Sequence, residues 1–96
     1  WVVHPGQDPV ALLKRHPGRF ALMHVKDMRK GTPTGKLTGS EDVRSDVALG
    51  SGQIDLAATL EAAQAAGVSH FFLEDESPEV LSQLPRSLRW LESLAW

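Results

Sequence analysis

The chain has 96 residues, of which 42% are hydrophobic and 23% charged, and its net charge is −2 with histidine neutral. This composition is that of one ordinary globular domain, and it excludes disordered, fibrous and two-domain chains. The absence of cysteine excludes disulfides, thiolate metal sites and a cysteine nucleophile. The acidic balance argues against a nucleic-acid partner, and no apolar run is long enough to span a membrane.

Short apolar runs alternate with helical stretches along the chain, a pattern that predicts βα units and a parallel sheet. Residues 1–3 (Trp-Val-Val) read as the end of a strand. Natural domains usually start in exposed polar sequence, whereas this chain starts inside an apolar segment, so we expect it to be a fragment of a longer protein. The sequence does not indicate a cellular compartment. The first helix is expected to start at Pro9, capped by Asp8, and to end at the turn of residues 16–18.

Residues 20–25 predict the next strand, which ends in the charged tetrad His24-Val25-Lys26-Asp27. Residues 28–53 are polar and rich in glycine, so we expect a long loop, which in compact domains is usually functional or disordered. Asp55 is expected to cap a second helix that ends at Gly67.

Residues 68–73 predict the third strand, which leads into Glu74-Asp75-Glu76. Ser77-Pro78 ends this segment, and a short helical turn is expected through Leu84. Pro85 is expected to begin the final helix, because proline favours the first helical position. The apolar stripe of this helix is predicted to comprise Leu84, Leu88, Leu91 and Ala95.

Strand geometry predicts a site at one end of the sheet. Alternate residues face the same side of a strand, so His24 and Lys26 share a face, as do Phe72 and Glu74. His24 and Glu74 end their strands, at the edge where parallel α/β folds and barrels bind ligands. We expect them at equivalent depths on successive strands, where an imidazole and a carboxylate could bind a divalent metal. The alternative is that both are ordinary solvent-exposed strand ends.

Five short motifs follow one another along the chain. They are Gly6-Gln7-Asp8-Pro9 after Trp1, His24-Val25-Lys26-Asp27, Gly50-Ser51-Gly52-Gln53-Ile54-Asp55, Phe72-Leu73-Glu74-Asp75 and Ser87-Leu88-Arg89-Trp90-Leu91. In this order they resemble the closing segment of the sugar phosphate isomerase/epimerase family, the xylose-isomerase-like barrels. The likeness covers nearly the whole chain, apart from about residues 29–46. It implies an α/β fold that forms the carboxy-terminal part of a (β/α)8 TIM barrel, from the end of strand six through helix eight, with parallel strands and outer helices.

The resemblance also implies roles for particular residues. His24 and Glu74 would be metal ligands at the ends of barrel strands seven and eight, for Mn²⁺, Mg²⁺, Co²⁺ or Zn²⁺, and Glu74 would also be a catalytic acid/base. Trp1, Lys26 and Asp27 would contact the substrate, although a solvated strand end is an equal alternative for Lys26 and Asp27. The family's metal-binding aspartate and its first catalytic glutamate would precede Trp1.

The implied function is a metal-dependent isomerase or epimerase that moves a proton next to the carbonyl of a sugar, sugar phosphate or cyclitol. A keto-cyclitol dehydratase on the same scaffold and a non-catalytic half-barrel are the alternatives. The Gly50-Ser51-Gly52 turn either holds a phosphate through its backbone N–H groups or is a plain connection into the next helix. Exposed strand edges predict self-association, as a homo-oligomer or as poorly soluble material, and we expect the chain alone to be inactive.

Overall fold

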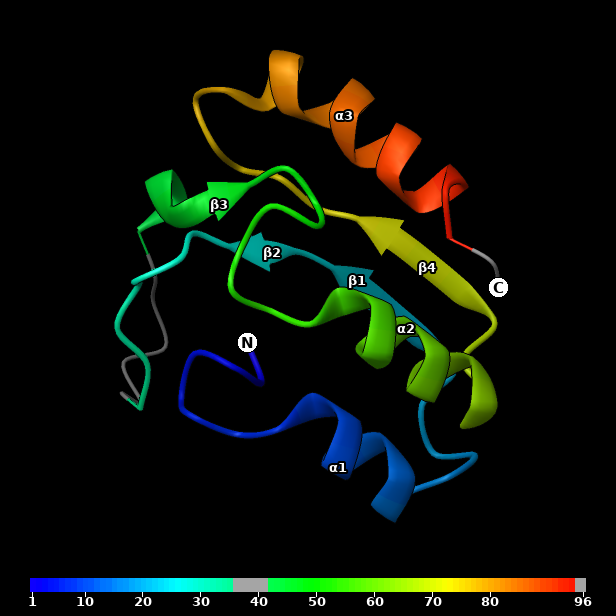
Figure 1. Cartoon of the computed structure of the whole chain (residues 1–96). Coiled ribbons are helices and arrows are strands. Elements are labelled where there is room, and N and C mark those ends of the chain that lie inside the picture. Colours follow the sequence, from blue (N-terminus) through cyan, green and yellow to red (C-terminus); the bar gives the residue numbers. More distant parts are fainter. Residues whose placement is uncertain (36–41, 95–96) are drawn as a thin grey trace.

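Two parallel strands, β1 (Leu22–Val25) and β4 (His70–Leu73), lie side by side at the centre of the computed structural model (Figure 1). The structure describes residues 1–35 and 42–94. Its other elements in chain order are α1 (Pro9–Arg15), β2 (Asp27–Met28), the 3-10 helix η1 (Val43–Ser45), β3 (Asp46–Val47), α2 (Leu56–Ala65) and α3 (Val80–Glu92). The predicted α/β class with a parallel strand pair is confirmed.

The first two helices begin where their caps predict. The carboxylate of Asp8 accepts the backbone N–H of Val10 at 2.9 Å, and Pro9 occupies the first helical position of α1. Asp55 caps α2 in the same way, accepting the N–H of Ala58 at 3.1 Å. Each cap satisfies a backbone donor that the first helical turn cannot, so local sequence fixes both starting points.

The helices pack against one face of the parallel strands. Met23 and Phe71 contact both of the buried apolar clusters that form the core. One cluster joins α1 to α2 and consists of Leu13, Ala62, Ala63, Ala66 and Val68. The other lies beneath α3 and consists of Val25, Leu49, Leu56 and Leu60. This face therefore supplies the burial that stabilises the fold.

The opposite face of the strands is exposed. Leu22 is 59% exposed and Phe72 is 48% exposed, although both are large apolar residues within strands. His24 and His70 lie on the same face and are also exposed. The helices therefore cover one face of the parallel strands and leave the other face exposed.

The prediction of a strand end at residues 1–3 is wrong. Residues 3–6 form a turn instead, in which the N–H of Gly6 donates to the carbonyl of Val3 at 2.8 Å and the N–H of Gln7 donates to the carbonyl of Val2 at 3.1 Å. These local contacts use two carbonyl groups that a strand would offer to a neighbouring strand.

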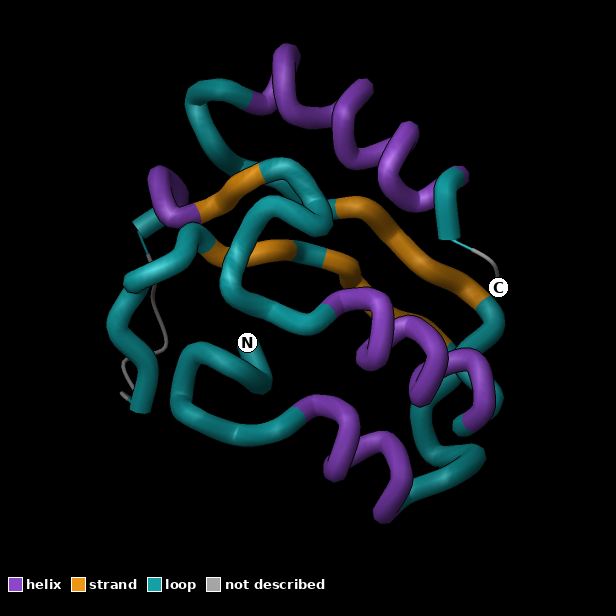
Figure 2. The backbone as a smooth tube through the Cα atoms, viewed as in Figure 1, coloured by secondary structure: helices purple, strands orange, loops and turns teal. Residues whose placement is uncertain are grey.

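The prediction that residues 28–53 are all loop is also wrong. β2 and β3 form a short antiparallel pair in which Asp27 opposes Val47 and Met28 opposes Asp46. Figure 2 shows this pair beyond the end of the parallel strands, where β2 continues the line of β1 and β3 lies beside it. Residues 36–41, in the middle of the predicted loop, lie outside the described residues.

Helix α3 differs from the prediction in its start and in its packed face. It begins at Val80, so Pro85 lies inside it rather than at its first position. Leu88, expected in the apolar stripe, is 51% exposed, and Ala95 lies outside the described residues. Leu91 packs against the core as predicted, and beside it lie the partly buried Trp90 and Leu94 and the buried Ser87. The Ser87 hydroxyl accepts the N–H of Leu49 at 2.9 Å, so α3 holds the loop before α2.

Gly50 and Gly52 are both positions in this loop where a side chain would collide with its neighbours, and only Gly50 also has a positive φ. Its φ is +86°, and a Cβ there would collide with the indole of Trp90. We expect Gly50→Ala to lower the free energy of unfolding by at least about 2 kcal/mol, because the left-handed backbone alone costs about 1–2 kcal/mol. The control is Gly18→Ala, where φ is +77° but nothing lies within 4 Å. Urea unfolding should show the larger loss at Gly50; equal losses would rule out the indole contact as a cause.

Candidate functional site

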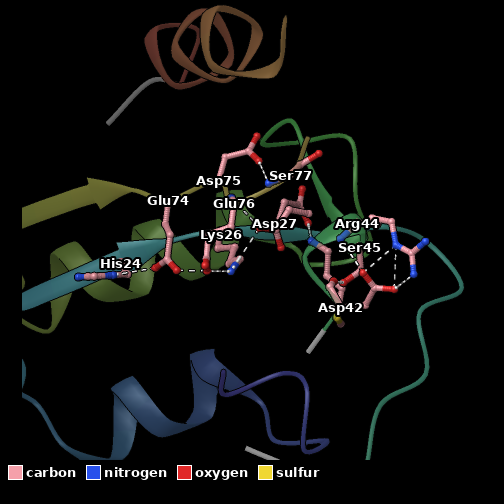
Figure 3. Close-up of polar contacts among 12 residues, drawn as sticks. His24, Lys26, Asp27, Asp42, Arg44, Ser45, Glu74, Asp75, Glu76 and Ser77 are labelled. Carbon is pink, nitrogen blue, oxygen red and sulfur yellow. Dashed lines mark hydrogen bonds and ion pairs between the residues drawn. The ribbon is translucent and has the colours of Figure 1, made fainter. Parts of the chain in front are cut away.

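His24 and Glu74 meet at the carboxyl end of the parallel strands. The His24 Nδ1 atom lies 2.7 Å from the Glu74 Oε2 atom, within hydrogen-bond distance (Figure 3). The prediction that His24 and Glu74 lie at equivalent depths on their strands is wrong. In the strand register His24 lies opposite Phe72, not opposite Glu74. Glu74 follows the last residue of β4, two residues after Phe72, and its N–H donates to the carbonyl of Val25 at 2.9 Å. The side chains face the same side and meet diagonally.

Lys26 lies between three carboxylates. Its Nζ atom is 3.0 Å from Glu76 Oε1, 3.3 Å from Asp46 Oδ2 and 3.4 Å from Glu74 Oε1. The Lys26 side chain is 18% exposed, so these contacts are shielded from water and salt more than a surface ion pair is. Lys26 and His24 therefore hold the two oxygens of Glu74 from opposite sides.

These contacts shift two pKa values. Burial lowers the pKa of Lys26, but the hydrogen bond to Glu76 and the charges of Asp46 and Glu74 outweigh it and hold this pKa above its usual value. The hydrogen bond from His24 lowers the pKa of Glu74, and burial opposes this effect only in part. At neutral pH Lys26 is a cation and Glu74 a carboxylate, the form that binds metals and accepts protons.

Asp46 was not predicted as a site residue. Its side chain is 2% exposed, and its Oδ2 atom also accepts the backbone N–H of Glu76 at 2.9 Å. Through these contacts β3 positions both Lys26 and the segment after β4. One feature of the sequence could have pointed to Asp46: it directly precedes the apolar run of residues 47–49. A carboxylate beside buried residues needs a cationic or N–H partner.

Asp27 has a different place from the one predicted for it. It is 1% exposed, and its carboxylate accepts backbone N–H groups from Met28 at 2.8 Å, Gly50 and Gly52 at 2.9 Å, and Ile54 at 3.3 Å. A buried carboxylate with four donors has no lone pair directed toward solvent. We therefore assign Asp27 to the framework of the Gly50–Ile54 loop, and its burial rules out the alternative of a solvated strand end.

Trp1 lies close to this framework and is 63% exposed, with its ring edge against His4 at a centroid distance of 6.2 Å. Trp1, Lys26 and Asp27, the residues predicted to contact substrate, line one small cavity of about 20 Å³. That volume is about enough for one water molecule and too small for a sugar. Any sugar that binds here must lie outside this cavity, over the exposed end of the strands.

The His24–Glu74 pair fits part of a metal site. Two ligand atoms at 90° and about 2.1 Å from a divalent ion are about 3.0 Å apart, so the pair would have to separate by about 0.3 Å and turn both lone pairs from each other toward the ion. Across residues 1–35 and 42–94, no group of three or more His, Asp or Glu side chains could hold a metal ion. These two residues would therefore supply one side of the coordination sphere, and further ligands would have to complete it.

No protein family, curated protein or solved structure matches this chain. Among the described helices, none is long and apolar enough to cross a membrane.

Proposed function

We propose that this chain is the carboxy-terminal part of a (β/α)8 barrel and carries two metal ligands of a divalent-metal-dependent sugar isomerase or epimerase. The observation that carries the proposal is the His24–Glu74 pair, at 2.7 Å, on the carboxyl ends of adjacent parallel strands. Active sites of such barrels lie at this end of the strands.

The strand pair supports the barrel part of the proposal. Within the described residues, β1 and β4 each have one edge without a strand partner. Barrels pair every edge, and their inner face is packed with large apolar side chains. The exposed face carries two large apolar residues, Leu22 and Phe72, beside His24 and His70, and the helices cover only the other side.

Glu74 is suited to two roles in the proposed reaction. Its Oε2 atom lies against His24, where a shared metal ion would bind, and its Oε1 atom lies near Lys26. A bound divalent ion would polarise the substrate carbonyl and acidify the adjacent C–H. Glu74, ionised at neutral pH, would accept that proton and return it to the sugar. Inversion needs a second acid on the opposite face, so we expect no turnover by this chain alone.

Metal binding tests the proposal directly. We expect trace Mn²⁺ to broaden the NMR signals of His24 and Glu74 before those of other residues, because a paramagnetic ion relaxes nearby nuclei. Glu74→Gln should weaken binding at least about tenfold, since even the loss of an outer-shell partner costs 10–100-fold. The control is His70→Ala, which removes another exposed histidine of the same strand pair and should leave the broadening unchanged. Broadening that is spread over all carboxylates, or that persists in Glu74→Gln, would reject the metal site.

A further inference from the structure

The Glu74 carboxylate is contacted at both of its oxygens by side chains of the neighbouring strand segment. Its Oε2 atom lies 2.7 Å from the His24 Nδ1 atom, and its Oε1 atom lies 3.4 Å from the Lys26 ammonium. His24 lies in β1 and Lys26 directly follows this strand. Figure 3 shows the carboxylate between the two groups. Glu74 therefore turns one oxygen toward the histidine and the other toward the lysine.

The two partners of Glu74 differ in how firmly they are fixed. The His24 side chain is 70% exposed, so the space beside Oε2 is open to solvent. The Lys26 side chain is 18% exposed, and its Nζ atom also lies 3.0 Å from Glu76 and 3.3 Å from Asp46. Asp46 is 2% exposed, and moving the ammonium away would leave this buried charge without its cation, which is strongly destabilising. The lysine is therefore the fixed side of the carboxylate.

Asp46 is itself held by the fold. It lies opposite Met28 in the β2–β3 pair, and its Oδ2 atom accepts the backbone N–H of Glu76 at 2.9 Å. The same oxygen faces the Lys26 ammonium. The position of this ammonium is thus set from β3, and through the ammonium so is the orientation of the Glu74 carboxylate.

We propose that Lys26 is a positioning residue that makes Glu74 a one-oxygen ligand. A carboxylate can bind a divalent ion through one oxygen or through both. Here Lys26 keeps the Oε1 atom, and a metal ion beside His24 meets the Oε2 atom alone. The inference rests on the proposed function for the metal ion, whereas the orientation of the carboxylate is a property of the metal-free chain.

The first measurement is made on the whole chain without metal. Three-bond NMR coupling constants of the Glu74 side chain report whether it keeps one rotamer. We expect one rotamer in the wild type and averaging between rotamers in Lys26→Met, because Oε1 then has lost its cation. The matched control is Lys14→Met, the same change at an exposed position of α1, which should leave the Glu74 couplings unchanged.

A second variant covers the case in which Lys26→Met does not fold. The double variant Lys26→Met/Asp46→Asn removes the buried charge together with its cation, so no buried ion is left unpaired. The asparagine oxygen can still accept the N–H of Glu76. The Glu74 couplings of this double variant should also be averaged.

The second measurement adds Zn²⁺ and records the infrared difference spectrum of the carboxylates. The gap between the antisymmetric and symmetric stretching frequencies widens when a carboxylate binds a metal through one oxygen and narrows when it binds through both. The bands that Glu74→Gln removes belong to Glu74. We expect widening in the wild type, narrowing in Lys26→Met, and widening again in Lys26→Arg, which keeps a cation. A role of Lys26 in the fold alone would weaken Zn²⁺ binding without reversing this change.

Three results would overturn the inference. They are rotamer averaging in the wild type, one fixed Glu74 rotamer after removal of Lys26, and a stretching gap that changes in the same direction with and without the lysine. Absence of Zn²⁺ bands from Glu74 in the wild type would instead reject the proposed function. The metal-free couplings would then decide by themselves whether Lys26 positions the carboxylate.

Discussion

Asp27→Asn is expected to lower the free energy of unfolding by about 3–5 kcal/mol, a large part of the stability of a domain of this size. An asparagine has the same shape, and its single oxygen can still accept from Met28 and Ile54. Its amide nitrogen would then face the N–H groups of Gly50 and Gly52, two donors that now share Oδ2. Each buried donor left without an acceptor costs about 1–3 kcal/mol.

Urea unfolding followed by circular dichroism measures this loss. The matched control is Asp8→Asn, the same chemical change at an exposed helix cap, where asparagine caps as well as aspartate does. We expect the control to unfold at nearly the wild-type urea concentration. Similar shifts in the two variants would mean that the buried carboxylate does not hold the loop.

The helices could be predicted from the sequence because their signals are local. Asp8 with Pro9 marks the start of α1, Asp55 marks the start of α2, and Gly67, with a φ of +99°, follows the end of α2. Each signal acts on the backbone within a few residues, so no knowledge of distant contacts is needed. The parallel pairing of β1 and β4 also followed from the alternation of strands and helices.

Elements that depend on distant partners could not be predicted in this way. β2 and β3 have two residues each, too few for any periodic pattern, and they form because Asp27 and Val47 come together across the intervening chain. Proline favours the first position of a helix, but Pro85 lies inside α3, where its ring is exposed and the packed residues of the helix lie elsewhere.

In the candidate site, too, the features that depend on local sequence could be predicted and the contacts between distant segments could not. His24 and Glu74 were predicted because strand alternation alone places them on one face at the carboxyl end. The contacts of Asp46 with Lys26, and of Asp27 with the glycine loop, arise only when the segment from residue 42 to residue 54 folds back over the strand ends. Sequence periodicity carries no information about that return, so the burial of Asp27 and Asp46 could not be predicted from it.

The second large effect is expected for Lys26→Met, which should lower the free energy of unfolding by about 3 kcal/mol at neutral pH. Methionine keeps most of the side-chain volume but leaves Asp46, which is 2% exposed, without its cationic partner. Removing one member of a buried ion pair typically costs about 3–5 kcal/mol, because the other charge stays buried. Since the pKa of Lys26 is raised, its contribution is fully present below its ordinary pKa and is lost only at strongly alkaline pH.

A double-mutant cycle measures how much of this loss comes from Asp46. Asp46→Asn removes the buried charge, so Lys26→Met should cost clearly less in that background than in the wild type. Acidification should also shrink the deficit of the single variant, because protonated carboxyl groups need no counter-ion. An equal cost in both backgrounds would mean that the 3.3 Å contact carries no energy and that Glu74 and Glu76 alone hold the lysine. A reduced cost would show that β3 stabilises the site through the contact of Asp46 with Lys26. This contact would then link the β2–β3 pair to the strand ends where His24 and Glu74 meet.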